Sequence, residues 1–232
     1  MVSGKNTLLR LKRESMRSEA PEDSAPVLER SRERQDHILA AAARVFAQKS
    51  YGLASMRDIA REARLPLSLL YYYVKSKQEM LHLISARAFD SLYTSLQERL
   101  VEITDPHERL LLLVHSHISY HMANLDEMKV LVREADSLTG RYTREIFRKK
   151  REYSKVCMGI LSEVAAVHGF SPSTAELRVC TSALFGMMNW SYVWYNPEKD
   201  TDVTALAEAM SHLFIHGFLG TGVLGRKGKR YA

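Results

Sequence analysis

Cysteine, proline and glycine are scarce in this chain. Two of its 232 residues are cysteine, six are proline and eleven are glycine. Cys157 and Cys180 are too few for a disulfide framework or a clustered zinc site, so we expect two buried apolar side chains. The low proline and glycine content excludes collagen-like and low-complexity chains. With 46% hydrophobic and 26% charged residues, the composition is that of a globular protein.

Long apolar runs are also missing. In the C-terminal part the longest strictly apolar run, Leu110 to Val114, has five residues, whereas a helix that spans a bilayer needs ~20. Charged residues interrupt the leucine pairs near the N-terminus, so no apolar core of a signal peptide forms there. We therefore expect a cytoplasmic protein with no membrane-spanning segment and no membrane partner.

Positive charge is concentrated in one region of the sequence. Residues 30–80 contain ten Lys and Arg against five Asp and Glu, whereas residues 81–225 contain fourteen against seventeen. A basic tail, residues 226–232, follows. A small basic head and a near-neutral body favour contact between the head and a polyanion, although an ordinary solvated surface has the same composition.

The first part of the chain predicts a flexible arm followed by short helices. Residues 1–31 are polar and show no sustained period, which indicates the arm. From Arg32 onward apolar residues recur at helical spacing up to a break at Gly52. Ser55 and Asp58 then form a variant of the capping box, which predicts a helix over residues 56–63.

Residues 65–74 are apolar and rich in tyrosine, so on their own they fit either a buried strand or a helix. The helix is preferred because no convincing partner strand exists elsewhere and Pro66 suits a helix start. Ser76 and Glu79 form a full capping box before a long helix that extends to about residue 102. The rest of the chain predicts helices near residues 107–124, 126–136, 140–168, 173–195 and 202–219, so the fold class is all-α.

Three short basic helices with a tight turn between the last two are what a helix-turn-helix requires. Residues 32–82 resemble the DNA-binding domain of TetR-type transcriptional regulators, through Val45-Phe46-Ala47, the run from Ser55 to Ala63 and the run from Leu70 to Lys77. The resemblance implies a helix-turn-helix domain over residues 32–92, with its motif at about 55–74. A long helix would join it to a helical ligand-binding and dimerisation domain over residues 93–225.

The resemblance implies a regulator, usually a repressor, that binds a palindromic operator in double-stranded DNA and needs no cofactor. Arg57 can reach a guanine edge or a phosphate, the tyrosines can donate to phosphates, and Lys77 beside a helix N-terminus makes an anion site. The predicted DNA-binding residues are Ser55, Arg57, Leu67, Ser68, Leu69, Tyr71, Tyr72 and Lys77.

Two features of the head depart from the usual TetR pattern. Arg64 replaces the glycine of the turn, which costs roughly 1 kcal/mol if the residue is left-handed. Leu67 and Leu69 occupy positions that are often polar, and apolar side chains in the major groove favour the methyl group of thymine. We therefore predict thymine at one or two positions of each half-site.

Two half-sites lie about 34–36 Å apart, so the body must form a homodimer. Small and apolar residues share the last two helices, which suits close helix packing between subunits in a four-helix bundle, with a core inside one chain as the alternative. The predicted interface residues are Ala183, Gly186, Met187, Trp190, Trp194, Ala209, Leu213 and Gly217.

Residues 189–197 resemble a C-terminal signature of TetR members that respond to acyl-CoA or steroid-derived CoA thioesters. The cationic helix from Arg141 to Lys155 can hold CoA phosphates, although such a run also fits a solvated face. The effector is therefore expected to be a small molecule of the acyl-CoA class. The predicted ligand-binding residues are His117, His121, Met122, Arg148, Arg151, Tyr153 and Met188.

The spacing of His117 and His121 also fits metal ligation, but no cysteine or carboxylate completes a site, so we expect no metal and two buried, hydrogen-bonded histidines. Two alternative functions stay open. One is a helical ligand-binding or adaptor protein without DNA binding. The other is an enzyme that acts on an acyl thioester, which the missing Gly-x-Ser-x-Gly and phosphate-binding motifs argue against, so no enzyme is expected.

Overall fold

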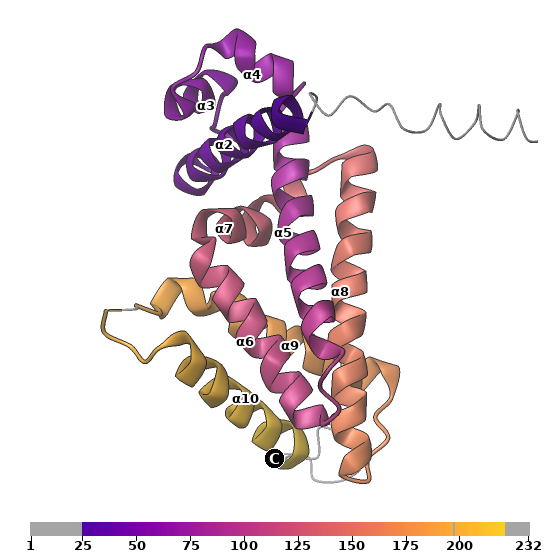
Figure 1. Cartoon of the computed structure of the whole chain (residues 1–232). Helices are drawn as coiled ribbons and strands as arrows, with labels where there is room; N and C mark the ends of the chain where they lie inside the picture. The colour runs from indigo at the N-terminus through magenta and orange to yellow at the C-terminus, as the bar shows by residue number, and fades with distance from the viewer. Residues whose placement is uncertain (1–24, 197, 221–232) are drawn as a thin grey trace, which may run out of the picture. The chain divides into compact units, whose positions relative to one another are not determined.

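A computed structural model describes residues 25–196 and 198–220, and every regular element in these ranges is a helix. The predicted all-α fold class is confirmed. In chain order (Figure 1) the elements are α2 (Ala25–Lys49), α3 (Met56–Ala63), α4 (Leu67–Tyr73), α5 (Lys77–Leu100), α6 (Pro106–Ala123), α7 (Leu125–Glu134), the short 3-10 helix η2 (Ala135–Ser137), α8 (Gly140–Val167), α9 (Thr174–Trp194) and α10 (Val203–Gly220).

Helix α2 begins earlier than the sequence predicted. It starts at Ala25, so residues 25–31 are helical and the prediction of an arm over residues 1–31 is wrong for them. Pro26 stands in the first turn, where its missing N–H has no helical partner to lose, and the residues after it are good helix formers. The rest of the predicted arm and the basic tail at 226–232 lie outside the described residues.

Serine caps begin three of the helices. Ser55 Oγ accepts from the N–H of Asp58 at 3.2 Å, and the Asp58 carboxylate accepts from the N–H of Ser55 at 3.0 Å. The hydrogen bond from Lys49 and those from Ser55 hold the pKa of Asp58 well below its usual range. At α5 only half of the predicted box forms, because Ser76 accepts from Glu79 while the Glu79 carboxylate accepts from the N–H of Lys75. A full box caps α9.

The body is built around α6, which packs against α5, α8, α9 and α10. Its face toward the core is apolar and fully buried at Leu110, Leu113 and Ile118. Cys157 and Cys180 are free and buried, as predicted, and burial raises the pKa of the Cys157 thiol to about 12. Within the described ranges, the helices are all too short or too polar to cross a membrane.

Candidate DNA-binding surface and effector cavity

The turn between α3 and α4 keeps a left-handed residue without glycine. Arg64 has φ +54° and ψ +42°. Its N–H donates to the carbonyl of Arg61 at 3.1 Å, and the N–H of Leu65 donates to that of Ala60 at 3.0 Å, the paired bonds of a Schellman motif. The turn therefore has the geometry that glycine would favour, with the strain of a side chain in the left-handed region.

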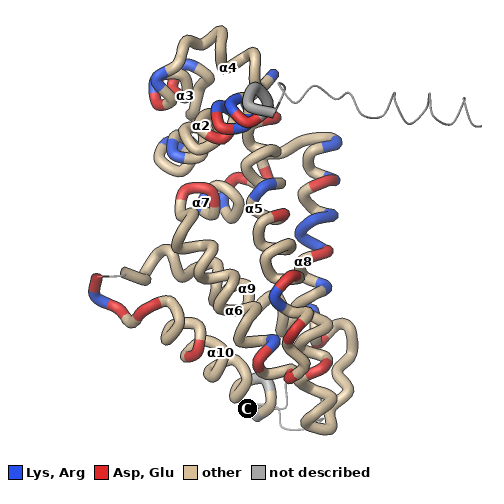
Figure 2. Tube along the Cα trace, in the orientation of Figure 1, with Lys and Arg blue, Asp and Glu red and all other residues tan. Residues whose placement is uncertain are grey.

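Residues 67–73 form the helix α4 and not an interior strand, as the sequence predicted. Leu70 and Val74 anchor it in the head and are fully buried. On the opposite side Ser68 is exposed, and the exposed fractions of Tyr71 and Tyr72 are 50% and 78%. Figure 2 shows that α4 carries no charged residue. The predicted groove-facing helix therefore presents hydroxyl and aromatic groups to solvent.

The remaining residues predicted to contact DNA differ in side-chain exposure and in whether the side chain is already hydrogen bonded within the head. Arg57 is exposed in the first turn of α3 and Leu67 and Leu69 are half-buried at the start of α4. The Ser55 hydroxyl is used in the cap, where it also donates to Asp58 at 2.6 Å.

Lys77 is engaged within the head. Its Nζ donates to the carbonyls of Tyr51 at 2.7 Å and Ala54 at 2.8 Å, and it lies 4.3 Å from the centre of the Tyr51 ring. A third carbonyl, that of Gly52, is 3.4 Å away. An ammonium group has only three N–H donors, so these bonds use the donors that a contact with a phosphate would need. In this structure Lys77 therefore ties the loop between α2 and α3 to the start of α5, and its contact with a DNA phosphate stays a prediction.

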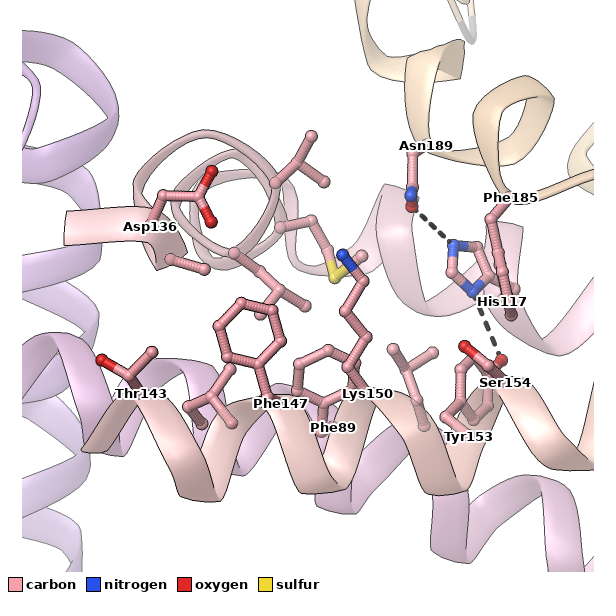
Figure 3. Close-up of a pocket in the computed structure, with 16 residues that line it drawn as sticks. Phe89, His117, Asp136, Thr143, Phe147, Lys150, Tyr153, Ser154, Phe185 and Asn189 are labelled. Atoms are coloured by element: carbon pink, nitrogen blue, oxygen red, sulfur yellow. Dashed lines mark hydrogen bonds between the residues drawn. The ribbon is translucent and has the colours of Figure 1, made fainter. Parts of the chain in front are cut away.

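The body contains a cavity of about 190 Å³. Side chains from α5, α6, α7, η2, α8 and α9 line it, and Figure 3 shows aromatic rings on several sides. The wall is mainly apolar, formed by Phe89, Leu92, Met128, Leu131, Ile146, Phe147 and Phe185. This lining suits an apolar ligand group.

One end of the cavity is polar. His117 lies 3.3 Å from the Tyr153 hydroxyl through Nδ1 and 3.1 Å from Asn189 Oδ1 through Nε2 (Figure 3). Burial, followed by the proximity of His121, lowers the pKa of His117 to about 4, so its ring is neutral at neutral pH. Burial also raises the pKa of Tyr153, which stays a phenol. The consistent pattern is donation from Tyr153 to Nδ1 and from Nε2–H to Asn189.

Helix α8 faces the cavity with a different set of residues from the predicted one. Thr143, Phe147, Lys150 and Ser154 line the cavity at intervals of three or four residues, which place them on one side of a helix. The exposed residues Arg148 and Arg151 fall outside this stripe, and Arg148 pairs with Glu152 at 2.8 Å. The structure therefore places Arg148 and Arg151 outside the cavity wall. The basic side chain in the cavity wall is that of Lys150.

Of the seven predicted ligand-binding residues, His117 and Tyr153 line the cavity. His121 and Met188 are fully buried and Met122 is half-buried, and the three stand outside the lining set. Asn189 is a lining residue that the prediction missed, although it belongs to the segment quoted for the resemblance.

The predicted interface residues lie on the surface of α9 and α10. The exposed fractions are 59% for Trp190, 50% for Trp194 and 67% for Leu213. Ala183, Gly186, Ala209 and Gly217 are also exposed, and Met187 is half-buried. These residues therefore do not form a core inside one chain, which was the alternative.

A helix-turn-helix head with an exposed second helix, together with a helical body that holds a cavity, defines a DNA-binding regulator. Residues 38–84 match the family described as "Bacterial regulatory proteins, tetR family", and residues 104–218 match the "Tetracyclin repressor-like, C-terminal domain". The chain belongs to the TetR family of transcriptional regulators.

Individual relatives agree with this assignment. The transcriptional regulator HbdR of Aromatoleum sp. (strain CIB) is 26% identical over 164 residues, which are 70% of this chain and 69% of that protein. A TetR-family regulator from Bordetella parapertussis is 28% identical with a TM-score of 0.74, over 81% of this chain and 96% of that one. The regulator AibR, solved with isovaleryl coenzyme A and operator DNA, has a TM-score of 0.69 at 24% identity, over 78% of this chain and 97% of that one.

Proposed function

We propose that this regulator is a homodimeric repressor that leaves its operator when a small acyl compound enters the cavity. The observation that carries the proposal is the cavity itself, which is apolar along most of its wall and has hydrogen-bonding groups at one end. Such a site favours a ligand with a short apolar part and one polar atom. The protein would act in the cytoplasm, where a bacterial operator lies.

The polar end fits the carbonyl oxygen of an acyl group. Because Tyr153 and the neutral His117 fix Asn189 Oδ1 as an acceptor, the amide nitrogen of Asn189 is the donor left for a ligand. Since the volume of about 190 Å³ is below the ~300–1,000 Å³ of sites for drug-sized ligands, only the acyl end of a larger compound would enter. Lys150 would meet an anionic group of the remainder.

An acyl-CoA has this combination of a short acyl group and a large anionic body. AibR holds isovaleryl coenzyme A in the same fold, so this compound is the first to test. Fluorescence anisotropy with labelled DNA from the region flanking the gene should show binding that weakens steeply with salt. Isovaleryl-CoA, longer acyl-CoAs and free CoA are then titrated against the complex.

We expect release by an acyl-CoA and not by free CoA. Lys150→Gln should weaken the response by about tenfold, because it removes a charged contact, whereas the matched control Arg151→Gln on the outer side of α8 should respond like wild type. DNA binding without release at saturating acyl-CoA would overturn the effector class. Failure to bind any flanking DNA would favour the ligand-binding or adaptor alternative.

Sequence preference should depend on the start of α4. Leu67 and Leu69 are half-buried beside the exposed Ser68, so we propose that they contact thymine methyl groups in the major groove. Exchange of thymine for uracil at single positions of a half-site removes only that methyl group. Unchanged affinity at every position would contradict this contact, and Leu67→Ala provides the matching change in the protein.

A further inference from the structure

Residues 135–139, which we call the η2 segment, connect α7 to α8 and have the cavity on one side. Ala135 and Asp136 line the cavity directly. Thr143 lines it as well, and its hydroxyl donates to the carbonyl of Leu138 at 2.6 Å. The N–H of Leu138 in turn donates to the carbonyl of Ala135 at 3.2 Å. The cavity wall and the η2 segment therefore share residues and hydrogen bonds, so we expect a ligand that moves Thr143 to act on the segment.

The side chain of Gln78, at the start of α5, holds the same segment. Its amide nitrogen donates to the carbonyl of Ser137 at 2.7 Å, and its amide oxygen accepts from the N–H of Thr139 at 3.2 Å. Both halves of one amide are thus bound to backbone groups two residues apart, so the side chain follows the segment when it moves. Glutamine supplies a donor and an acceptor together, which neither glutamate nor methionine does.

Gln78 also stands at the edge of the DNA-binding head. Its neighbour Lys77 holds the carbonyls of Tyr51 and Ala54 in the loop between α2 and α3. The buried Tyr51 ring packs edge-on against Phe46 at 5.3 Å between ring centres. Movement of Gln78 therefore reaches the loop from which α3 begins.

We propose that Gln78 is a positioning residue through which occupation of the cavity changes the placement of the helix-turn-helix. This inference rests on the proposed function of the cavity as the effector site. The coupling is carried by one side chain with two backbone bonds to the η2 segment and by the adjacent lysine on the head. It predicts that the two sites lose their thermodynamic coupling when the amide is removed.

A double-mutant cycle tests the coupling without a known effector. Val132 lines the cavity, so we expect the larger side chain of Val132→Phe to fill part of it as a built-in occupant. Gln78→Met keeps the length of the side chain and removes both hydrogen bonds. The dissociation constant of the complex with flanking DNA is measured by anisotropy for wild type, each single variant and the double variant, after circular dichroism has shown that each is folded.

Val132→Phe should change the dissociation constant by about tenfold in the wild-type background and by less than about threefold beside Gln78→Met. The control Asp90→Asn removes another link between α5 and α8, the ion pair with Lys149, and should leave the tenfold effect in place. Equal effects with and without Gln78 would overturn this inference alone. No effect of Val132→Phe in wild type would instead refute the cavity as the effector site, and the inference with it.

Gln78→Glu covers the case in which Gln78→Met abolishes DNA binding. The carboxylate can still accept from the N–H of Thr139 but cannot donate to the carbonyl of Ser137. The effect of Val132→Phe should then fall below the tenfold value of the wild-type background. An undiminished effect in Gln78→Glu would count against the coupling.

Discussion

The folded body should lose stability in mild acid because two histidines are buried without charge. Burial is the main cause that lowers the pKa of His117 and of His121 to about 4, from an ordinary value of 6.5. Between these values the unfolded chain binds protons that the folded chain does not. The stabilisation that comes from the neutral rings is therefore complete above pH 6.5, and it is lost as the pH falls from 6.5 through about 4.

The size of the effect follows from the shift. One pKa unit corresponds to 1.36 kcal/mol, so a shift from 6.5 to about 4 at His117 is worth about 3 kcal/mol. The two rings lie 6.1 Å apart between centres, and a charge on one opposes a charge on the other, so their contributions are not additive. Even one such contribution is a large part of the roughly 5–15 kcal/mol that stabilises a domain.

Urea denaturation at several pH values between 7.5 and 4.5, followed by tryptophan fluorescence, measures this loss. His117→Gln removes one titrating ring and keeps an amide that can reach Asn189, so its free energy of unfolding should fall less steeply with pH, by up to about 1.4 kcal/mol per pH unit. Identical slopes for wild type and His117→Gln would refute the assignment of a buried neutral ring.

Three further predictions concern stability and assembly. Arg64→Gly should raise the free energy of unfolding of the head, measured in urea, by about 0.5–1 kcal/mol, because φ of Arg64 is +54°. Gly169→Ala, at φ +76° in the corresponding position after α8, should lower it by about 1 kcal/mol. A loss of stability in Arg64→Gly would contradict the strain. Lys77→Met should lower the stability of the head by about 1–3 kcal/mol, because the carbonyls of Tyr51 and Ala54 lose their donor. Unchanged thermal stability together with weaker DNA binding would instead indicate that Lys77 contacts a phosphate. Trp190→Glu should convert the proposed dimer into a monomer in analytical ultracentrifugation and weaken operator binding. A dimer of unchanged affinity would place the interface elsewhere.

The helix-turn-helix could be predicted from sequence because its signals are local. The capping serine at position 55, the apolar period of α2 and the inward positions of Leu70 and Val74 each act within a few residues, and the structure has the helices there. Local signals also explain the wrong start of α2, since a polar first turn with a proline reads equally as a helix start or an arm.

The cavity could not be predicted to the same depth, because the partners of charged residues are set by the tertiary structure. Arg148 pairs along its own helix with Glu152, Lys149 pairs with Asp90 on α5, and Lys77 binds loop carbonyls. In the sequence these three cations and Lys150 look alike, and the predictions assign Lys77 to a DNA phosphate and the cations of α8 to CoA phosphates.

Successive residues of a helix point about 100° apart, because one turn has 3.6 residues. The basic residues of α8 therefore lie on different faces of the helix. The face of α8 toward the cavity is fixed by buried apolar residues such as Ile146 and Tyr153, and Lys150 shares that face while Arg151 does not. The apolar pattern of a helix therefore selects the charge that reaches a ligand. A cluster of positive charge predicts a binding role only after that face is known.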